Sequence, residues 1–232
     1  MGYAGFVPVR QLVLVDLLGL IMATRPGERA VVGIDGVDGA GKSHLAAELL
    51  ALAQRLAGRE LHSVSMDGFH HPREVRYARG RSAESYYRDA FDYEAFRRHV
   101  LIPFRAGREV VPAVHDVATD QAILPDAIEA AEDAVLLVDG VFLHRPELTA
   151  VWDASLFVHA PFEISVPRGN ARHSVQQAAE SDPDDPEDPV HARYVQAQRW
   201  YLEQAPAQQA TWVLDNSNLS QPLLDWGAEV GP

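Results

Sequence analysis

The 232-residue chain contains no cysteine, and lysine occurs only once, at Lys42. The absence of thiols excludes disulfides and thiolate-ligated zinc, and it agrees with a reducing compartment, so we expect a cytoplasmic location. Arginine fills 19 of the 20 basic positions. The presence of lysine at this one position therefore suggests that its side chain has a specific chemical role.

Positive charge is scarce overall, since 33 acidic residues face 20 basic ones and the formal net charge is -13. This excess of negative charge disfavours sequence-independent binding to the phosphates of nucleic acids, although a local pocket can still bind a small anion. The apolar run Leu12 to Met22 contains Asp16 and is too short to span a bilayer. We expect neither nucleic acid nor membrane as a partner, and we predict an amphipathic helix at about residues 9–23, packed on the domain.

The single lysine stands in GVDGAGKS, residues 36–43, which matches the Walker A pattern G-x-x-x-x-G-K-[ST]. A short β-branched run precedes it at residues 30–35, and apolar residues at helical spacing follow it up to Gly58. Glycines let successive backbone N–H groups line one concavity, to which the helix N-terminus adds positive potential. We therefore predict an ATP-binding loop of Gly36, Val37, Asp38, Gly39, Ala40, Gly41, Lys42, Ser43 and His44.

Two side chains of this loop have expected chemical roles. The compact ammonium of Lys42 can follow the β and γ phosphates, whereas a guanidinium is larger and requires a planar, forked partner. The Ser43 hydroxyl is expected to hold Mg²⁺. ATP and Mg²⁺ are thus the predicted cofactors, and a chance glycine-rich turn is the alternative that the flanking strand and helix disfavour.

Four further apolar runs predict strands at residues 61–66, 134–140, 154–160 and 210–216. Together with residues 30–35 they give an α/β fold with a five-stranded parallel sheet and helices on both faces. The length favours a single domain over residues 1–232, with an acceptor-side insertion at about 68–126 that holds an irregular hairpin. A helical stretch is expected at 82–104, and the acidic, proline-rich run near residue 185 predicts a lid at about 173–190.

Two aspartates follow strands directly, at the edge where ligands of parallel sheets bind. They are Asp67 and Asp139, and either one alone could be a turn former or a helix cap. Their pairing beside Lys42 favours a functional interpretation. The adjacent His70 and His71 have no third ligand at suitable spacing, which disfavours a metal site in SMDGFHHP.

These motifs together resemble the uridine kinase-like branch of the P-loop kinases, a group that includes pantothenate kinase and phosphoribulokinase. The resemblance covers about residues 31–216 and rests on GIDGVDGAGKS, SMDGFHHP, RDAFDYEAF, LLVDG and RYVQAQRWYLEQA before VLDNSN. It implies that Asp67 faces the acceptor hydroxyl and acts with Lys42 in catalysis. It also implies that Asp139 serves the magnesium ion with Ser43.

The same resemblance suggests further ligand contacts. Phosphate-contacting residues of the helix before the lid correspond to Arg168 and Arg172, of which we assign Arg172 to ATP and Arg168 to the acceptor. The other expected acceptor contacts are His71, Asp89 and His115. Pro167 interrupts the pattern of this helix and is expected to kink it or delay its start.

The predicted function is an ATP-dependent kinase that phosphorylates a hydroxyl of a small metabolite. Nucleoside-specific members present a Tyr and a His to the pyrimidine, whereas this chain has His115 and Asp120, so pantothenate, a sugar or a sugar acid is the alternative acceptor. A non-catalytic adenine-nucleotide-binding protein is a second alternative. A guanine-specific switch is excluded, because its N-K-x-D element needs a lysine besides Lys42. A homo-oligomer is left open.

Overall fold

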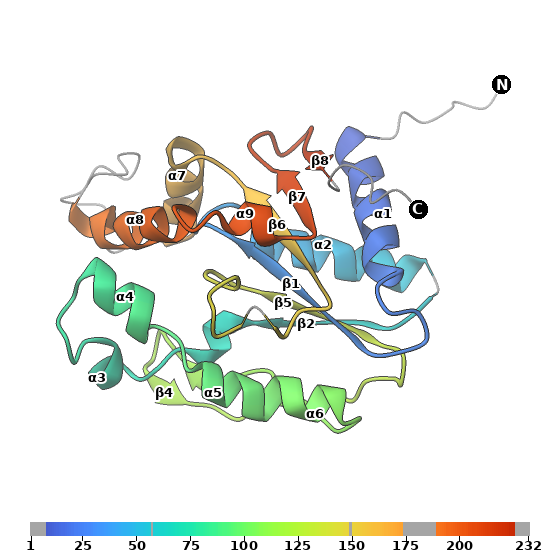
Figure 1. Cartoon of the computed structure of the whole chain (residues 1–232), viewed down its shortest axis with the longest axis horizontal. Helices are drawn as coiled ribbons and strands as arrows, with labels where there is room; N and C mark the ends of the chain where they lie inside the picture. The colour runs from blue at the N-terminus through green and yellow to red at the C-terminus, as the bar shows by residue number, and fades with distance from the viewer. Residues whose placement is uncertain (1–7, 57, 149, 174–188, 226–232) are drawn as a thin grey trace.

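A computed structural model describes residues 8–56, 58–148, 150–173 and 189–225 of the chain. Its centre is a six-stranded sheet in the order β2-β5-β1-β6-β7-β8 (Figure 1). The strands are β1 (Ala30–Gly36), β2 (Leu61–Ser65), β5 (Val135–Asp139), β6 (Ala154–His159), β7 (Trp212–Asp215) and β8 (Leu223–Asp225). The five predicted strands are present and pair in parallel.

The sixth strand, β8, pairs antiparallel with β7 and was not predicted from the apolar pattern. It has only three residues, and Leu223 is exposed, so it has neither the length nor the burial that mark a strand in the sequence. Antiparallel edge strands are common on otherwise parallel sheets. The prediction of five strands was therefore one too few.

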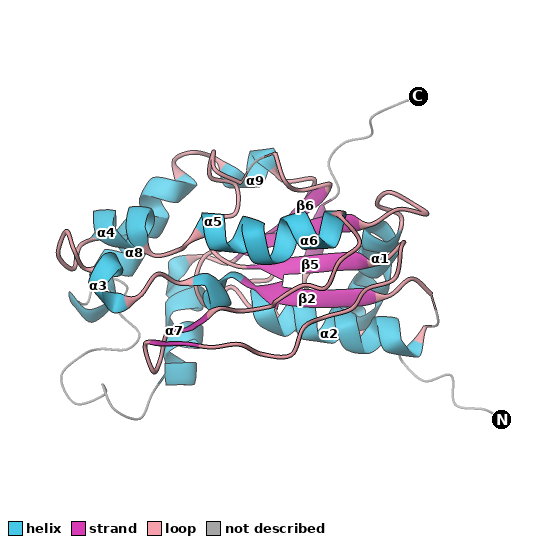
Figure 2. Ribbon diagram, turned by 90° about the horizontal axis from the view of Figure 1, so that it is seen from below, coloured by secondary structure: helices cyan, strands magenta, loops and turns pink. Residues whose placement is uncertain are grey.

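Helices cover both faces of the sheet, as predicted (Figures 1 and 2). One face packs against α1 (Val9–Met22) and α2 (Lys42–Arg55), where Val32 and Ile34 of β1 join the core. On the other face, Val31 joins a second core formed with the insertion helices and α8 (Pro189–Leu202). The insertion helices are α4 (Ala83–Asp89), α5 (Tyr93–Phe96), a π-helical turn (Arg97–Leu101) and α6 (Ile102–Arg105). Both faces of β1 are buried, which explains the apolar run that precedes Asp35.

Two helix predictions need correction. Helix α1 buries Leu17 and Ile21, but Leu12 and Val15 on its outer face are 53% and 44% exposed, so it is less amphipathic than expected. The stretch 82–104 is not one helix, because α4 ends at Asp89 and the side chain of Asp92 caps α5 by accepting a hydrogen bond from Ala95 N.

Four further helical elements complete the described fold outside the two-stranded hairpin. They are a 3₁₀ turn (Met66–Phe69), α3 (Arg73–Arg76), α7 (Phe162–His173) and α9 (Pro206–Gln209). The predicted hairpin within 108–126 consists of β3 (His115–Asp116) and β4 (Gln121–Ala122), with His115 opposite Ala122. Helix α7 already begins at Phe162, so Pro167 lies inside it and does not delay its start. Most of the predicted lid, 173–190, falls outside the described residues.

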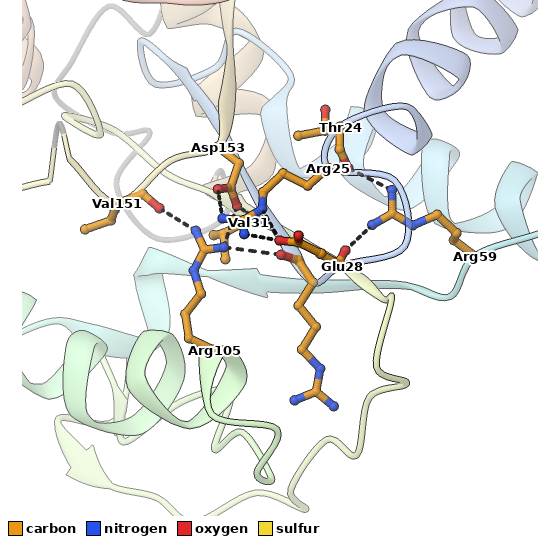
Figure 3. A network of polar contacts seen from close by, with 9 residues as sticks. Thr24, Arg25, Glu28, Val31, Arg59, Arg105, Val151 and Asp153 are labelled. Atoms are coloured by element: carbon orange, nitrogen blue, oxygen red, sulfur yellow. Dashed lines mark hydrogen bonds and ion pairs between the residues drawn. The ribbon is translucent and has the colours of Figure 1, made fainter.

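A polar network ties the amino ends of the strands together, opposite the phosphate loop (Figure 3). The carboxylate of Asp153, just before β6, accepts a 2.7 Å hydrogen bond from Val31 N and pairs with Arg105 at 2.7 Å and Arg25 at 3.1 Å. Arg59 donates to the carbonyls of Met22, Thr24, Glu28 and Asp133. No helix within the described ranges is long and apolar enough to cross a membrane.

Candidate active site

The Walker A segment forms the connection between the end of β1 and the start of α2, which is the context that the motif requires. Gly41 at the N-cap of α2 is left-handed, with φ of 99°, and no side chain in the described part of the chain caps this terminus. Gly39 has φ of 72°, and a Cβ there would lie 1.9 Å from the carbonyl oxygen of Ser165 in α7. The loop thus combines an uncapped helix N-terminus with a backbone that only glycine permits, which fits the binding of phosphate groups.

The ammonium of Lys42 folds back over this loop. Its Nζ donates a 2.8 Å hydrogen bond to the carbonyl of Val37, and the residue is only 8% exposed. Two long-range contacts brace the loop from outside: Asn216 Nδ2 donates to Ala40 O at 2.7 Å, and Asp38 N donates to Gln198 Oε1 at 2.7 Å. The positive charge is therefore held at the concavity where phosphates are expected.

The residues predicted to hold magnesium contact each other. Ser43 Oγ donates a 2.6 Å hydrogen bond to Asp139 Oδ2, which joins the start of α2 to the end of β5. Burial raises the pKa of the Asp139 carboxyl, while the Ser43 hydroxyl and the charge of Lys42 partly offset this effect. A hydroxyl and one carboxylate suit Mg²⁺, which keeps several waters and takes phosphate oxygens as its other ligands.

The described residues do not by themselves form a metal site. In the ranges that the structure describes, no group of three or more His, Cys, Asp or Glu side chains could hold a metal ion. The Ser43–Asp139 pair therefore fits a magnesium ion that arrives with a nucleotide, and it does not form a complete cage.

Asp67 lies on the 3₁₀ turn that follows β2, next to the end of β5, because Ser65 is in register with Asp139. Its backbone N–H donates to Ser65 Oγ at 3.3 Å, and its carbonyl lies 2.9 Å from His70 Nδ1. Its side chain is exposed, and its charge is one of the influences that raise the pKa of Asp139. A solvent-facing carboxylate thus lies beside the phosphate loop, on a turn fixed by its own backbone.

The other predicted acceptor residues are engaged within the insertion. His115 is buried, with Nε2 3.2 Å from Asp120 Oδ1, and the His71 ring lies 3.9 Å from the Asp92 carboxylate. Asp89 accepts from Arg79 at 2.9 Å through one oxygen, and its other oxygen is buried with no hydrogen-bond partner among the described residues. The contact of these side chains with an acceptor stays a prediction.

The remaining predicted ligand contacts are Arg168 for the acceptor and His44 and Arg172 for ATP. Arg168 donates to the carbonyls of Asn216 at 2.8 Å and Ser217 at 2.6 Å, which places it beside the bracing residue of the phosphate loop. His44 is exposed on α2, 3.8 Å from Glu48. Arg172 belongs to α7, but its side chain lies outside the described part of the chain.

Two groups of residues near the loop were not expected from the sequence. The carboxylate of Asp38 accepts from Tyr86 Oη at 3.1 Å and from Gln198 Nε2 at 2.9 Å, so the loop is joined to α4 and α8. Asp35, fully buried at the end of β1, lies 2.6 Å from His144 Nδ1 and accepts from the Tyr201 hydroxyl. Tyr86 and Tyr201 carry no local sequence signal, since each contact joins positions tens of residues apart.

No protein-family model matches the chain, and no curated protein sequence matches it. Solved structures do match. A protein described as a possible uridine kinase from Bacillus stearothermophilus is 24% identical, with a TM-score of 0.67 over 88% of this chain and 97% of that one. A protein described provisionally as a fructose transport system kinase from Silicibacter sp. TM1040 is 25% identical, with a TM-score of 0.61 over 83% and 95%.

These similarities define the fold as that of a P-loop kinase. Within that class, the predicted resemblance to the uridine kinase-like group is confirmed at the level of the fold by the structural neighbours. The two neighbours are named for different acceptors, so the fold alone does not select one.

Proposed function

We propose that the protein is an ATP-dependent, Mg²⁺-requiring kinase that transfers the γ-phosphoryl group of ATP to a hydroxyl of a small metabolite. The observation that carries the proposal is the 2.6 Å contact between Ser43 and Asp139, at the start of a helix whose first residue is Lys42. This contact brings the Walker A hydroxyl to a strand-end carboxylate, which is the arrangement that P-loop phosphotransferases use for magnesium.

In the proposed reaction, the bond between the γ-phosphorus and the oxygen bridging to ADP breaks, and a new bond forms to the acceptor oxygen. The hydroxyl proton passes to Asp67, which is exposed beside the loop. Lys42 and the N–H groups at the start of α2 stabilise the charge on the β and γ phosphates. Magnesium, when bound, would neutralise phosphate charge next to Ser43 and Asp139.

The acceptor is proposed to be a nucleoside or a non-nucleoside metabolite such as pantothenate, a sugar or a sugar acid. A coupled assay of ADP release, with and without each compound, tests the proposal. We expect at least one hydroxyl compound to accelerate ADP formation well above the rate with ATP alone. A flat rate across a broad panel, together with tight ATP binding, would instead indicate a non-catalytic nucleotide-binding protein.

A further inference from the structure

Three arginines surround the ring of Tyr77. They belong to or flank α3, α4 and α8, which lie together at one end of the molecule (Figure 1). The guanidinium carbons of Arg81, Arg76 and Arg193 lie 4.7, 5.2 and 5.4 Å from the centre of the Tyr77 ring. Arg193 also stacks on Tyr194 at 4.3 Å. In a chain with a net charge of -13, this is a local concentration of positive charge.

Among the described residues, a carboxylate pairs with only one of the three arginines. Within the described ranges, Arg76 pairs with Asp120 at 3.5 Å, whereas Arg81 and Arg193 have no ion-pair partner there. Although partial burial opposes the change, the hydrogen bond from Arg193 and the charges of Arg76 and Arg81 lower the pKa of Tyr77. The guanidiniums of Arg81 and Arg193 lie over aromatic rings and can each donate two parallel hydrogen bonds. Such a pair is suited to binding a carboxylate or a phosphate group.

A short path of aromatic contacts links this cluster to the proposed reaction centre. The rings of Tyr194 and Tyr86 meet edge to face at 4.7 Å, and Tyr86 Oη donates to Asp38 of the phosphate loop. Burial raises the pKa of Tyr86 most, and the charges of Asp38 and Asp67 raise it further. Tyr86 is thus within electrostatic reach of Asp67, and its ring contacts Tyr194, on which Arg193 stacks.

On the basis of the proposed function, we propose that the acceptor is an anion whose carboxylate or phosphate is held by Arg81 and Arg193 while its hydroxyl reaches Asp67. The distribution of charges in the protein favours one of the two possible orientations of such a molecule. Its anionic end is repelled by Asp38 and Asp67 and attracted by the arginines, so the neutral hydroxyl end is directed to the phosphate loop.

Matched acceptors that differ in one charge test the proposal: glycerate against glycerol, gluconate against glucose, and ribose 5-phosphate against ribose. In the ADP-release assay we expect the charged member of at least one pair to have a kcat/KM about 10- to 100-fold higher, the range for a charge-assisted contact. The KM of that acceptor should also rise with ionic strength, whereas the KM of a neutral compound should not.

Two substitutions locate the anion site. Arg81→Gln and Arg193→Gln should each raise the KM of the charged acceptor about 10-fold or more with little change in kcat or in the KM of ATP. Arg88→Gln is the matched control, because Arg88 is exposed on α4 and already pairs with Glu84 at 3.0 Å. It should leave all three constants unchanged.

The outcomes separate the two proposals. If neutral acceptors are turned over as well as charged ones, or if the two variants behave like Arg88→Gln, the acceptor is not held by these arginines, yet the kinase function stands. If no compound in any pair accelerates ADP formation, the proposed function itself fails, and the inference fails with it.

Discussion

Asp67 differs from Asp139 in its surroundings, although both follow a strand at the same edge of the sheet. Asp139 is buried and bonded to Ser43, whereas Asp67 is exposed, and only its backbone groups fix the turn. A buried carboxylate joined to the Walker A hydroxyl suits a metal ligand. A solvent-facing carboxylate beside the phosphate loop suits a group that must meet a second substrate.

The substitution Asp67→Asn tests this division of roles. The amide keeps the size and accepts hydrogen bonds but cannot take a proton, so we expect kcat to fall by about 10²- to 10⁴-fold. Affinity for ATP, measured by titration, should change little. Asp126→Asn, an exposed aspartate of the insertion, is the control and should retain activity. Near-normal turnover of the Asp67 variant would mean that this residue is a turn former and no base.

Lys42→Ala removes the only lysine from the phosphate loop. We expect kcat/KM for ATP to fall by about 10²- to 10³-fold, as for the loss of one preorganised donor to a developing charge. The fold, followed by circular dichroism, should persist, since Lys42 contacts a loop carbonyl and not the hydrophobic core. Arg55→Ala in the last turn of the same helix should have no effect on ATP. An unchanged kcat/KM would refute the phosphate role of Lys42.

At the scale of elements, the phosphate loop depends on its close approach to α7. Gly39 and Gly27 both have left-handed backbones, with φ of 72° and 78°, but a Cβ would meet Ser165 O at 1.9 Å only at Gly39. Comparing alanine at the two sites therefore separates backbone strain from the loss of this approach. Urea unfolding measures the first effect, and ATP titration measures the second.

Gly27→Ala should lower the free energy of unfolding by about 1–2 kcal/mol, the cost of placing a Cβ in a left-handed backbone, and leave ATP binding intact. Gly39→Ala should lower the free energy of unfolding further and abolish ATP binding, because α7 or the loop must move. Similar behaviour of the two variants would show that the packing of the loop against α7 does not shape the nucleotide site.

At the scale of the whole molecule, the two ends of the sheet have different tasks. The carboxyl ends of the strands carry the candidate site, and the amino ends are held by Asp153 and its arginine partners (Figure 3). Asp153→Asn should lower the free energy of unfolding by about 1–3 kcal/mol, because the Val31 N–H and two partly exposed guanidiniums lose a charged acceptor. Kinetic constants at 25 °C should not change.

Glu28→Gln provides the comparison for Asp153, since Glu28 pairs with Arg25 but its side chain is 62% exposed. Its effect on the free energy of unfolding should stay within about 0.5 kcal/mol, as is usual for surface ion pairs. A change in the KM of ATP in the Asp153 variant would contradict the independence of the two ends of the sheet.

Local patterns were sufficient for the five parallel strands and the Walker A loop. A buried parallel strand appears in the sequence as a continuous apolar run. The Walker A pattern lies within eight consecutive residues, so the loop from Gly36 to Ser43 could be predicted from local sequence alone. The short strand β8 could not be predicted this way, because its pairing comes from β7. The break after Asp89 was missed for a similar reason: Asp92 N donates to Phe69 O, a tertiary bond from the turn after β2.

By itself, then, the sequence determined the strand–loop–helix unit, the parallel sheet and the two strand-end aspartates, since each depends on residues close together along the chain. Only the tertiary structure decided that Ser43 contacts Asp139, 96 positions away, and that Arg193 reaches Tyr77, 116 positions away. Such contacts follow from how helices pack on a sheet, and the residue types alone do not specify that packing. The arginine cluster was therefore invisible in a chain whose overall charge is strongly negative.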